Sequence, residues 1–511
     1  MLAQLLSYGL MGIEGFPVTV EAYVSGGLPM FEVVGLPDAA VKEARERVRA
    51  ALVNSGYEMP VSRITVNLAP GDVRKEGPAF DLTIALAILM ASGQLHCAQA
   101  DEERLVLGQL ALSGEVTGVR GVLPMVISAR DRGVREALLP RDNAAEVACV
   151  EGVRVIPVAT LAEAVGHLSG QTPVVPQPQV PYAALQADWQ PHHDLSAVRG
   201  QSGAKRALEI AAAGGHNLLM IGPPGSGKTM LARCLPGILP DMTFEEALET
   251  TRIHSAAGVV AAGCGLLAER PFRAPHHTAS AVALVGGGAK AKPGEISLAH
   301  GGVLFLDELP EYNRPTLEAM RQPLEDGFVS IARINAQARY PARVMMVAAM
   351  NPCPCGHYGS QAQQCRCTQH DIRRYLDRIS GPLLDRIDLQ MEVEAVPVRE
   401  IADNAPEEAS AAVRSRVNAA RERQRARYAQ AGIHCNAQLS AKQLDAACGL
   451  DEEGKALLFR AVERYKLSMR AYSRVLKVAR TVADLAGEAR VRAPYIAEAI
   501  QYRNLDAKYW H

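Results

Sequence analysis

Short apolar runs alternate along the chain with stretches in which apolar residues recur at helical spacing. Apolar runs bounded by glycine, proline or charged residues are typical of strands, and the helical spacing is typical of amphipathic helices. The pattern predicts a multidomain α/β protein. In its first part the expected strands are 17–24, 31–34, 64–68, 105–112, 137–140 and 154–157, and the expected helices are 40–53, 82–91 and 125–132.

Three later runs are almost continuously apolar, at 217–221, 303–306 and 343–350. Strands that are buried on both faces of a parallel sheet have this character. A glycine-rich stretch follows the first run, an Asp-Glu pair follows the second, and Asn351 follows the third. We therefore expect buried strands that deliver these groups to the carboxyl edge of a parallel sheet.

The glycine-rich stretch has the spacing of a phosphate-binding loop between a strand and a helix. Its residues are Gly222, Pro223, Pro224, Gly225, Ser226, Gly227, Lys228 and Thr229. The glycines let backbone N–H groups converge on phosphate oxygens, Lys228 would reach the β- and γ-phosphates, and Thr229 would hold Mg²⁺. An incidental glycine-rich turn is the alternative, and the downstream carboxylates argue against it. The motif predicts ATP and Mg²⁺ as cofactors.

Asp307 and Glu308 are expected to complete the site. Asp307 would orient Mg²⁺, and Glu308 would polarise the attacking water as a general base. The alternative is a strand that ends in an acidic turn. Asn351 is a candidate for holding the water near the γ-phosphate.

Arg386 is a candidate arginine finger, which would stabilise charge on the nucleotide of a neighbouring subunit. The alternative is that it pairs with Asp385 or Asp388. An arginine supplied in trans implies a closed ring of subunits.

The composition narrows the class of protein. The chain has 511 residues, of which 48% are hydrophobic and 21% charged, so several domains are expected. The net charge is −1, so any DNA-binding surface must be local, for example lining a pore. No apolar run is long enough to span a membrane, and the start of the chain lacks a signal-peptide pattern. We therefore expect a cytoplasmic protein without a membrane partner.

Four cysteines lie close together in the sequence, in the pairs Cys353-Pro-Cys355 and Cys365-Arg-Cys367. Their thiolates could supply four tetrahedral ligands to a structural Zn²⁺, with His357 as a substitute ligand. The C-x-C spacing departs from the commoner C-x₂-C pattern, and four free thiols are the alternative. In a reducing cytoplasm a metal is favoured over disulfides.

Residues 1–168 resemble the C-terminal domain of Lon protease, a domain of the ribosomal S5 domain 2 type, and its relative in the RadA repair protein. The resemblance lies in 75–78, 114–117, 121–124, 132–134 and 138–140. Lon's serine nucleophile would fall at Ala79 and its lysine base near Pro124, and neither residue can activate a hydroxyl. The resemblance therefore implies an assembly or DNA-contacting module without protease activity. Dense prolines then predict a linker at 169–193.

The rest of the chain resembles AAA+ ATPases of the magnesium-chelatase and MCM branch. The resemblance implies a P-loop αβα core at 194–395, with 194–201 beside the adenine, followed by a helical lid at 396–511. Arg470 matches the second-sensor arginine of that branch, at the start of a lid helix, and Arg474 is the runner-up.

Two inserts mark this branch of AAA+ proteins. One insert contains 272–280 and 285–296, and the other is 326–340, whose two alternating runs predict a β-hairpin. In related hexameric helicases both loops grip DNA in a central channel. The resemblance therefore implies DNA-phosphate contacts for Lys290, Lys292 and Arg333. Solvated loop charges are the alternative.

The complete order of domains resembles the YifB/ComM family of bacterial proteins. That resemblance implies a homo-hexameric ATPase that moves on single-stranded and branched DNA. It would promote branch migration during homologous recombination of transforming DNA, together with recombinase-associated factors. Two alternatives are a chelatase-type motor subunit, which drives metal insertion or remodels a protein partner, and a non-enzymatic Lon-like binding module. The Lon-like domain argues against the first, and intact Lys228, Asp307 and Glu308 argue against the second.

Overall fold

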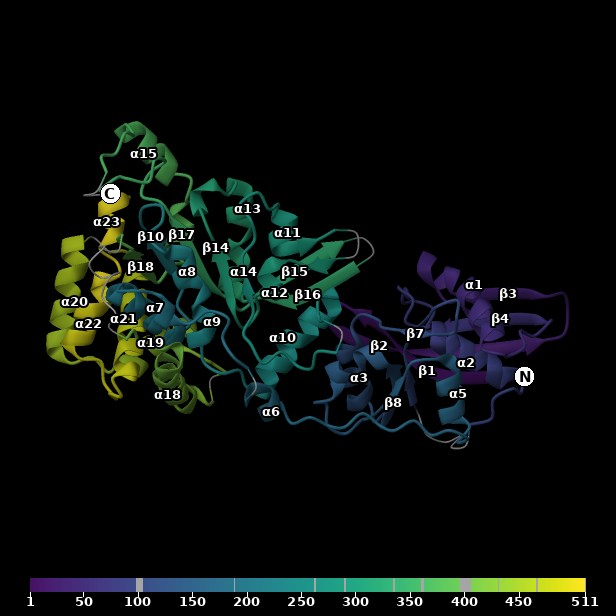
Figure 1. The fold of residues 1–511 in the computed structure, drawn as a ribbon. Helices are drawn as coiled ribbons and strands as arrows, with labels where there is room; N and C mark the ends of the chain where they lie inside the picture. The colour runs from purple at the N-terminus through teal and green to yellow at the C-terminus, as the bar shows by residue number, and fades with distance from the viewer. Residues whose placement is uncertain are drawn as a thin grey trace. The chain divides into compact units, whose positions relative to one another are not determined.

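The computed structural model describes residues 1–97, 104–187, 189–261, 263–288, 291–333, 336–359, 363–395, 406–430, 432–465 and 467–510. The chain forms two compact units, each built from three segments (Figure 1). One unit consists of Met1–Asp188, Phe244–Ala268 and Ala332–Tyr340, and the other of Trp189–Thr243, Glu269–Ile331 and Pro341–His511.

The first unit contains a seven-stranded sheet in the order β3-β4-β2-β1-β5-β8-β9. Its strands are β1 (Leu2–Met11), β2 (Glu14–Ser25), β3 (Met30–Val34), β4 (Arg63–Ala69), β5 (Arg104–Val106), β8 (Glu136–Pro140) and β9 (Arg154–Val158). Strand β2 is antiparallel to β1 and β4, and the other neighbours are parallel. The predicted strands are thereby confirmed, except that 105–112 is split between β5 and the short β6 (Gln109–Leu110).

Helices α1 (Ala39–Asn54), α2 (Asp81–Ala91), α3 (Val122–Asp131) and α5 (Leu161–Leu168) belong to the same unit. Helix α2 is apolar on every side and almost wholly buried, as expected of a helix inside a core. The structure places Ala79 just before α2 and Pro124 within α3, and both residues carry only hydrocarbon side chains.

The segment Phe244–Ala268 packs within the first unit, although the resemblance to AAA+ ATPases implies that it lies in the ATPase core. Its helix α10 (Phe244–Ala257) lies on α3, where the Gly121 N–H donates to the Ser255 carbonyl over 3.1 Å. Leu266 is buried in the same apolar cluster as α3. Apolar contacts thus outweigh closeness in sequence for this segment.

The second unit contains a five-stranded parallel sheet in the order β11-β14-β17-β10-β18. Its strands are β10 (Leu218–Ile221), β11 (Phe272–Arg273), β14 (Val303–Leu306), β17 (Met345–Met350) and β18 (Leu389–Glu392). All residues of β10, β14 and β17 are buried, which confirms the three predicted buried strands. Ile221 pairs with Met350, so β10 and β17 end at the same level.

Helices pack on this sheet, and the C-terminal part of the unit is entirely helical in the described residues. The helices before residue 400 are α7 (Ser202–Gly214), α8 (Lys228–Arg233), α9 (Leu235–Ile238), α11 (Ala281–Val285), α12 (Glu295–Leu298), α13 (Arg314–Ala319), α14 (Arg321–Asp326), α15 (Gln369–Leu376) and α16 (Gly381–Leu384). The later helices are α18 (Ser410–Tyr428), α19 (Ala441–Cys448), α20 (Glu452–Tyr465), α21 (Met469–Leu485), α22 (Ala493–Gln501) and α23 (Leu505–Tyr509).

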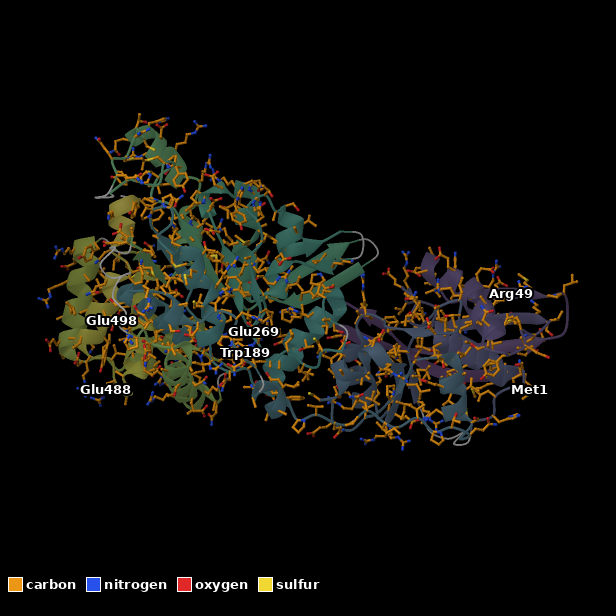
Figure 2. All side chains as sticks on the ribbon, viewed as in Figure 1. Met1, Arg49, Trp189, Glu269, Glu488 and Glu498 are labelled. Carbon is orange, nitrogen blue, oxygen red and sulfur yellow. The ribbon has the colours of Figure 1, made fainter. Side chains whose placement is uncertain are left out.

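The C-terminal helices share one hydrophobic core with the sheet and its helices. Helices α18 and α21 both pack on α7. Glu498 of α22, labelled in Figure 2, accepts a hydrogen bond of 2.8 Å from Arg206 of α7. Arg480 and Asp484 form a fully buried ion pair within α21. In the part of the chain that the structure describes, no helix is both long and apolar enough to cross a membrane.

Candidate active site

The phosphate-loop motif connects β10 to α8, which confirms the predicted strand–loop–helix. Gly225 and Gly227 have left-handed φ angles of +76° and +89°, which residues with a Cβ rarely adopt. A Cβ on Gly222 would overlap the carbonyl oxygen of Val393, just beyond β18. The path of this loop therefore requires the glycines that the motif supplies.

Lys228 is the first residue of α8, and its side chain is largely buried. Its Nζ donates to the carbonyl oxygens of Gly222 over 2.7 Å and Pro223 over 2.8 Å, and lies 3.4 Å from Oδ1 of Asn351. Burial lowers the pKa of the Lys228 ammonium, and the carboxylate of Asp307 opposes that shift. A cation held at the centre of such a loop is suited to binding terminal phosphates.

Thr229 and Asp307 meet at the carboxyl edge of the sheet. The Thr229 hydroxyl donates to Oδ2 of Asp307 over 2.8 Å, which joins the start of α8 to the end of β14. A hydroxyl and a carboxylate oxygen are the kind of ligands that Mg²⁺ prefers, and it binds few protein groups because it keeps several waters. These two residues therefore fit a magnesium ion bound together with phosphates.

Glu308 follows Asp307 in a left-handed conformation, with φ of +52°. Its side chain is 55% exposed, and Oε2 lies 3.2 Å from Nδ1 of His277. His277 follows β11, the parallel neighbour of β14. The centroids of the His277 and Tyr312 rings are 6.5 Å apart. The Tyr312 hydroxyl donates to the Pro275 carbonyl over 2.6 Å, and this hydrogen bond holds the segment that carries His277 in place.

Two polar residues outside the loop, Asn351 and Gln201, contact the loop or the start of α8. Asn351 follows β17, next to the β10 strand that carries the loop. Gln201, from the segment expected beside adenine, also has a left-handed φ. Its Nε2 donates to the Ser226 carbonyl over 3.4 Å and to the Glu394 carbonyl over 2.6 Å. The lead-in segment therefore contacts the phosphate loop directly.

Arg386 pairs with the carboxylate of Glu325 on α14, and its Nη1 donates to the Pro382 carbonyl over 2.7 Å. The alternative in which Arg386 pairs with Asp385 or Asp388 is wrong, because the structure gives those carboxylates other partners. Arg386 is thus held by a side chain that is itself largely exposed.

Two arginines of α21 pair with the carboxylates that flank Arg386 in the sequence. Arg470 is mostly exposed and lies 3.3 Å from Asp385, whereas Arg474 lies 2.6 Å from the buried Asp388. Burial would raise the pKa of Asp388, but the hydrogen bond with His216 and the charge of Arg474 hold it well below its usual value. Arg474 therefore has a structural partner, and Arg470 is the more accessible of the two.

The four clustered cysteines converge in space as well as in sequence. The Sγ atoms of Cys353, Cys355, Cys365 and Cys367 all lie within 4.8 Å of one another. Those of Cys353, Cys355 and Cys365 are 3.4 to 3.7 Å apart. Tetrahedral ligation with Zn–S distances of about 2.3 Å places sulfur atoms about 3.8 Å apart, so the arrangement fits Zn²⁺. Backbone N–H groups of Arg366 and His357 lower the pKa of the Cys355 thiol to about 6, whereas burial raises the pKa of the Cys353 and Cys367 thiols.

The predicted inserts form two small antiparallel sheets. Strands β15 (Phe328–Arg333) and β16 (Ala336–Pro341) form the predicted hairpin, and β12 (Gly286–Gly287) pairs with β13 (Lys292–Pro293). Lys292 is exposed at the start of β13. Lys290 lies outside the described residues, and Arg333 is the last residue of β15, with its side chain outside the described part.

Comparison with known proteins agrees with this arrangement. The chain matches the families described as Magnesium chelatase, subunit ChlI, over residues 194–401, as Subunit ChlI of Mg-chelatase over 20–143, and as Magnesium chelatase, subunit ChlI C-terminal, over 407–503. The uncharacterized protein YifB of Escherichia coli is 46% identical over 497 residues, which cover 97% of this chain and 96% of YifB. The competence protein ComM of Haemophilus influenzae is 46% identical over 509 residues, which cover 98% and 97% of the two chains.

The chain belongs to the YifB/ComM family. As a YifB/ComM protein it has the magnesium-chelatase type of AAA+ ATPase domain, which implies ATP and Mg²⁺ at the loop described above. Lon protease of Roseiflexus castenholzii is 32% identical over 109 residues, which cover 21% of this chain and 13% of Lon. This shorter match agrees with the Lon resemblance and with a multidomain α/β fold.

Sequence reasoning alone does not single out His277 as a partner of Glu308. The adjacent pair His276-His277 is visible in the sequence, but its interpretation as packing or hydrogen bonding is as favourable as a catalytic one. The available signal is its place in the segment that follows β11, because an adjacent parallel strand leads its following segment to the same sheet edge.

Proposed function

We propose that this YifB/ComM protein hydrolyses ATP as a homo-hexamer and moves on single-stranded and branched DNA in the cytoplasm. There it would promote branch migration during homologous recombination of transforming DNA, with recombinase-associated factors as partners. The observation that carries ATP hydrolysis is the hydrogen bond between Thr229 and Asp307, with Glu308 as the next residue. This arrangement supports magnesium binding by Thr229 and Asp307, with Glu308 as the general base, beside one phosphate loop.

The proposed division of roles follows the geometry. Lys228 neutralises the terminal phosphates, Thr229 and Asp307 hold Mg²⁺, Glu308 polarises the water, and Asn351 orients it. Magnesium, when bound, would neutralise charge that develops on the phosphate oxygens. The exposed Arg470 would contact nucleotide from the lid helix α21 and couple hydrolysis to lid motion.

DNA is the proposed partner of the inserts. The printed name of the Haemophilus relative is a competence protein, and Lys292 of this chain is exposed on an insert beside Lys290, with Arg333 on the other insert. The direct experiment compares ATP hydrolysis without DNA, with single-stranded DNA and with a three-strand branched substrate, and then measures branch migration. Stimulation by DNA and strand movement are expected. Failure of DNA to bind or stimulate would overturn the motor proposal.

Replacing Lys292 by alanine is expected to weaken DNA binding in a salt-dependent manner. A lost phosphate contact lowers the slope of log affinity against log salt by about one per contact, without changing sequence preference. Binding of fluorescent DNA at several salt concentrations measures that slope. Lys442→Ala, which removes another exposed lysine from α19, is the matched control and should leave the slope unchanged. Equal slopes for Lys292→Ala and the unmodified protein would favour solvated loop charges.

Arg386→Ala is expected to bind ATP but to lose about 10³-fold in turnover, because an arginine finger stabilises transition-state charge. If the arginine acts on a neighbouring subunit, mixing Arg386→Ala chains with Lys228→Ala chains restores part of the activity. The first chain then keeps an intact loop, and the second supplies the arginine. Phosphate release from the mixture measures this rescue.

A matched control removes the partner of Arg386 instead. Glu325→Gln breaks the same ion pair but leaves the arginine in place, so turnover should persist. Equal loss of turnover in both variants, with no rescue on mixing, would assign Arg386 a purely structural role.

We also propose that Cys353, Cys355, Cys365 and Cys367 hold a structural Zn²⁺. The expected result is one zinc per chain, measured by elemental analysis of protein washed with a weak chelator. Cys355→Ser with Cys367→Ser should remove it, because two thiolates leave the tetrahedral shell incomplete. Cys264→Ser, which changes an exposed cysteine outside the cluster, should retain zinc. A washed protein that neither contains nor takes up zinc would leave four free thiols as the correct interpretation.

A second candidate function is that of a chelatase-type motor subunit, which drives metal insertion or remodels a protein partner. The match to the magnesium chelatase subunit family over 194–401 favours it. ATP hydrolysis that is indifferent to DNA but stimulated by a protein partner would support this candidate over the DNA motor.

A further inference from the structure

The cysteine-containing turn lies directly after the candidate sensor residue Asn351. Only Pro352 separates Asn351 from Cys353, whose side chain is fully buried. The Tyr358 N–H approaches the Cys353 Sγ at 3.3 Å, and the Gly356 N–H donates to the Cys353 carbonyl over 3.0 Å. The path of the turn between 353 and 359 is therefore organised around one sulfur of the cluster.

The same turn contacts the phosphate loop. A Cβ on Gly356 would lie only 2.5 Å from Cδ and 2.8 Å from Cγ of Pro224. The Gly356 backbone therefore packs against the ring of Pro224, the residue before the left-handed Gly225. Two residues near the cluster therefore contact the phosphate loop: Gly356 packs against Pro224, and Asn351 accepts a hydrogen bond from Lys228.

The far side of the turn is supported by the end of the chain. The ring of Tyr358 lies 6.4 Å from that of Tyr509 in an edge arrangement. The Tyr509 hydroxyl donates to Glu392 of β18 over 2.6 Å, and the next residue, Val393, is the one whose carbonyl closes on Gly222. The turn therefore lies between two groups that shape the phosphate loop.

We infer that the metal-binding turn is a wall of the nucleotide site, so that Zn²⁺ on the four thiolates sets the affinity for nucleoside triphosphate. The inference rests on the zinc site proposed above. A bound ion holds Cys353 and Cys355 in a fixed turn, and the fixed Gly356 limits how far Pro224 can move. Without the ion the turn gains conformational freedom, and nucleotide binding must then order both the turn and the loop. The class of ligand affected is a phosphate chain, because Pro224 belongs to the phosphate loop.

Two glycines of the turn provide a matched test. Gly356 and Gly359 both have left-handed φ angles, +84° and +75°, so alanine introduces similar backbone strain at either position. A Cβ on Gly359 meets nothing within 4 Å, whereas one on Gly356 meets Pro224. In the full chain, Gly356→Ala should retain stoichiometric zinc and weaken binding of a fluorescent ATP analogue about tenfold, whereas Gly359→Ala should retain both.

Zinc removal tests the same inference without a substitution in the turn backbone. Stripping zinc from the unmodified protein with a strong chelator, followed by dialysis, should also weaken binding of the analogue about tenfold, and added Zn²⁺ should restore it. Circular dichroism distinguishes this effect from unfolding. If Gly356→Ala fails to fold, Cys355→Ser with Cys367→Ser provides the zinc-free comparison.

The outcomes separate the inference from the proposals on which it rests. A folded, zinc-free chain that binds the analogue with unchanged affinity overturns the inference while leaving the zinc site and the ATPase intact. A chain that never takes up zinc overturns both the zinc site and the inference. Loss of analogue binding in every variant, the unmodified protein included, instead overturns the ATPase proposal.

Discussion

Replacing Lys228 by alanine is expected to abolish ATP turnover and to weaken nucleotide binding. The Lys228 ammonium donates to the Gly222 and Pro223 carbonyls inside the loop. Its removal therefore eliminates both the positive charge and two hydrogen bonds that hold the loop. Loss of a preorganised charge-stabilising group costs about 10²- to 10³-fold in turnover, and the loosened loop adds to that loss. Phosphate release and binding of a fluorescent ATP analogue measure the two effects separately.

Lys477→Ala is a suitable control for the loss of a buried ammonium. Lys477 lies on α21, and its Nζ donates to the Ala437 carbonyl over 2.7 Å, away from the phosphate loop. Burial lowers the pKa of Lys477 as it does that of Lys228. This variant should lose stability but hydrolyse ATP normally once folded. Equal turnover in Lys228→Ala and the unmodified protein would place the ATP site elsewhere.

Glu308→Gln is expected to separate binding from chemistry. The amide has the size of the carboxylate and can keep the contact with His277, so the loop and the Thr229–Asp307 pair should remain intact. It cannot accept a proton, and loss of a general base costs about 10²- to 10⁴-fold in turnover. ATP should therefore stay bound and unhydrolysed, as measured by nucleotide retained after rapid desalting and by phosphate release.

The control for this change is Glu311→Gln, three residues further along the chain. Glu311 is an exposed carboxylate that pairs with Arg378, so the variant removes the same charge from the same segment. Its turnover should be close to that of the unmodified protein. If Glu308→Gln hydrolysed ATP at the normal rate, the base would have to be another residue, and the left-handed conformation of Glu308 would need another explanation.

The central part of the site could be predicted because its strands carry a strong signal. Runs such as 303–306 have no polar alternation, and a glycine-rich loop, an Asp-Glu pair or an asparagine follows each one at the sheet edge. The register then brings Gly222, Asp307 and Asn351 to that edge, as the pattern indicates. A strand that is buried on both faces is continuously apolar, so it can be recognised in the sequence without knowing its distant contacts.

The position of His277 could not be predicted in the same way. The strand before it, β11, spans only Phe272–Arg273, which is too short for a period of two to be recognised. The partner of Arg386, Glu325, could not be predicted either, because the two residues are distant in the sequence. Glu325 lies 61 residues away in the sequence, and the nearer carboxylates Asp385 and Asp388 pair with arginines of α21.

The segment Phe244–Ala268 shows the limit of sequence order as a guide to domains. The segment belongs to the first unit because α10 packs on α3, and the order of the sequence does not reveal this contact. Domain boundaries taken from motifs therefore do not assign the helices between those motifs to a unit.

That segment also determines how this chain can be taken apart. The backbone passes between the two units after residues 188, 243, 268, 331 and 340, five covalent connections in place of the single one that a linker at 169–193 suggests. Cutting at the prolines would separate α10 from α3 and uncover the apolar side chains of Phe244 and Leu248. A chimera that joins one unit to the other unit of a relative therefore cannot be made with a single junction, because the chain crosses between the units five times.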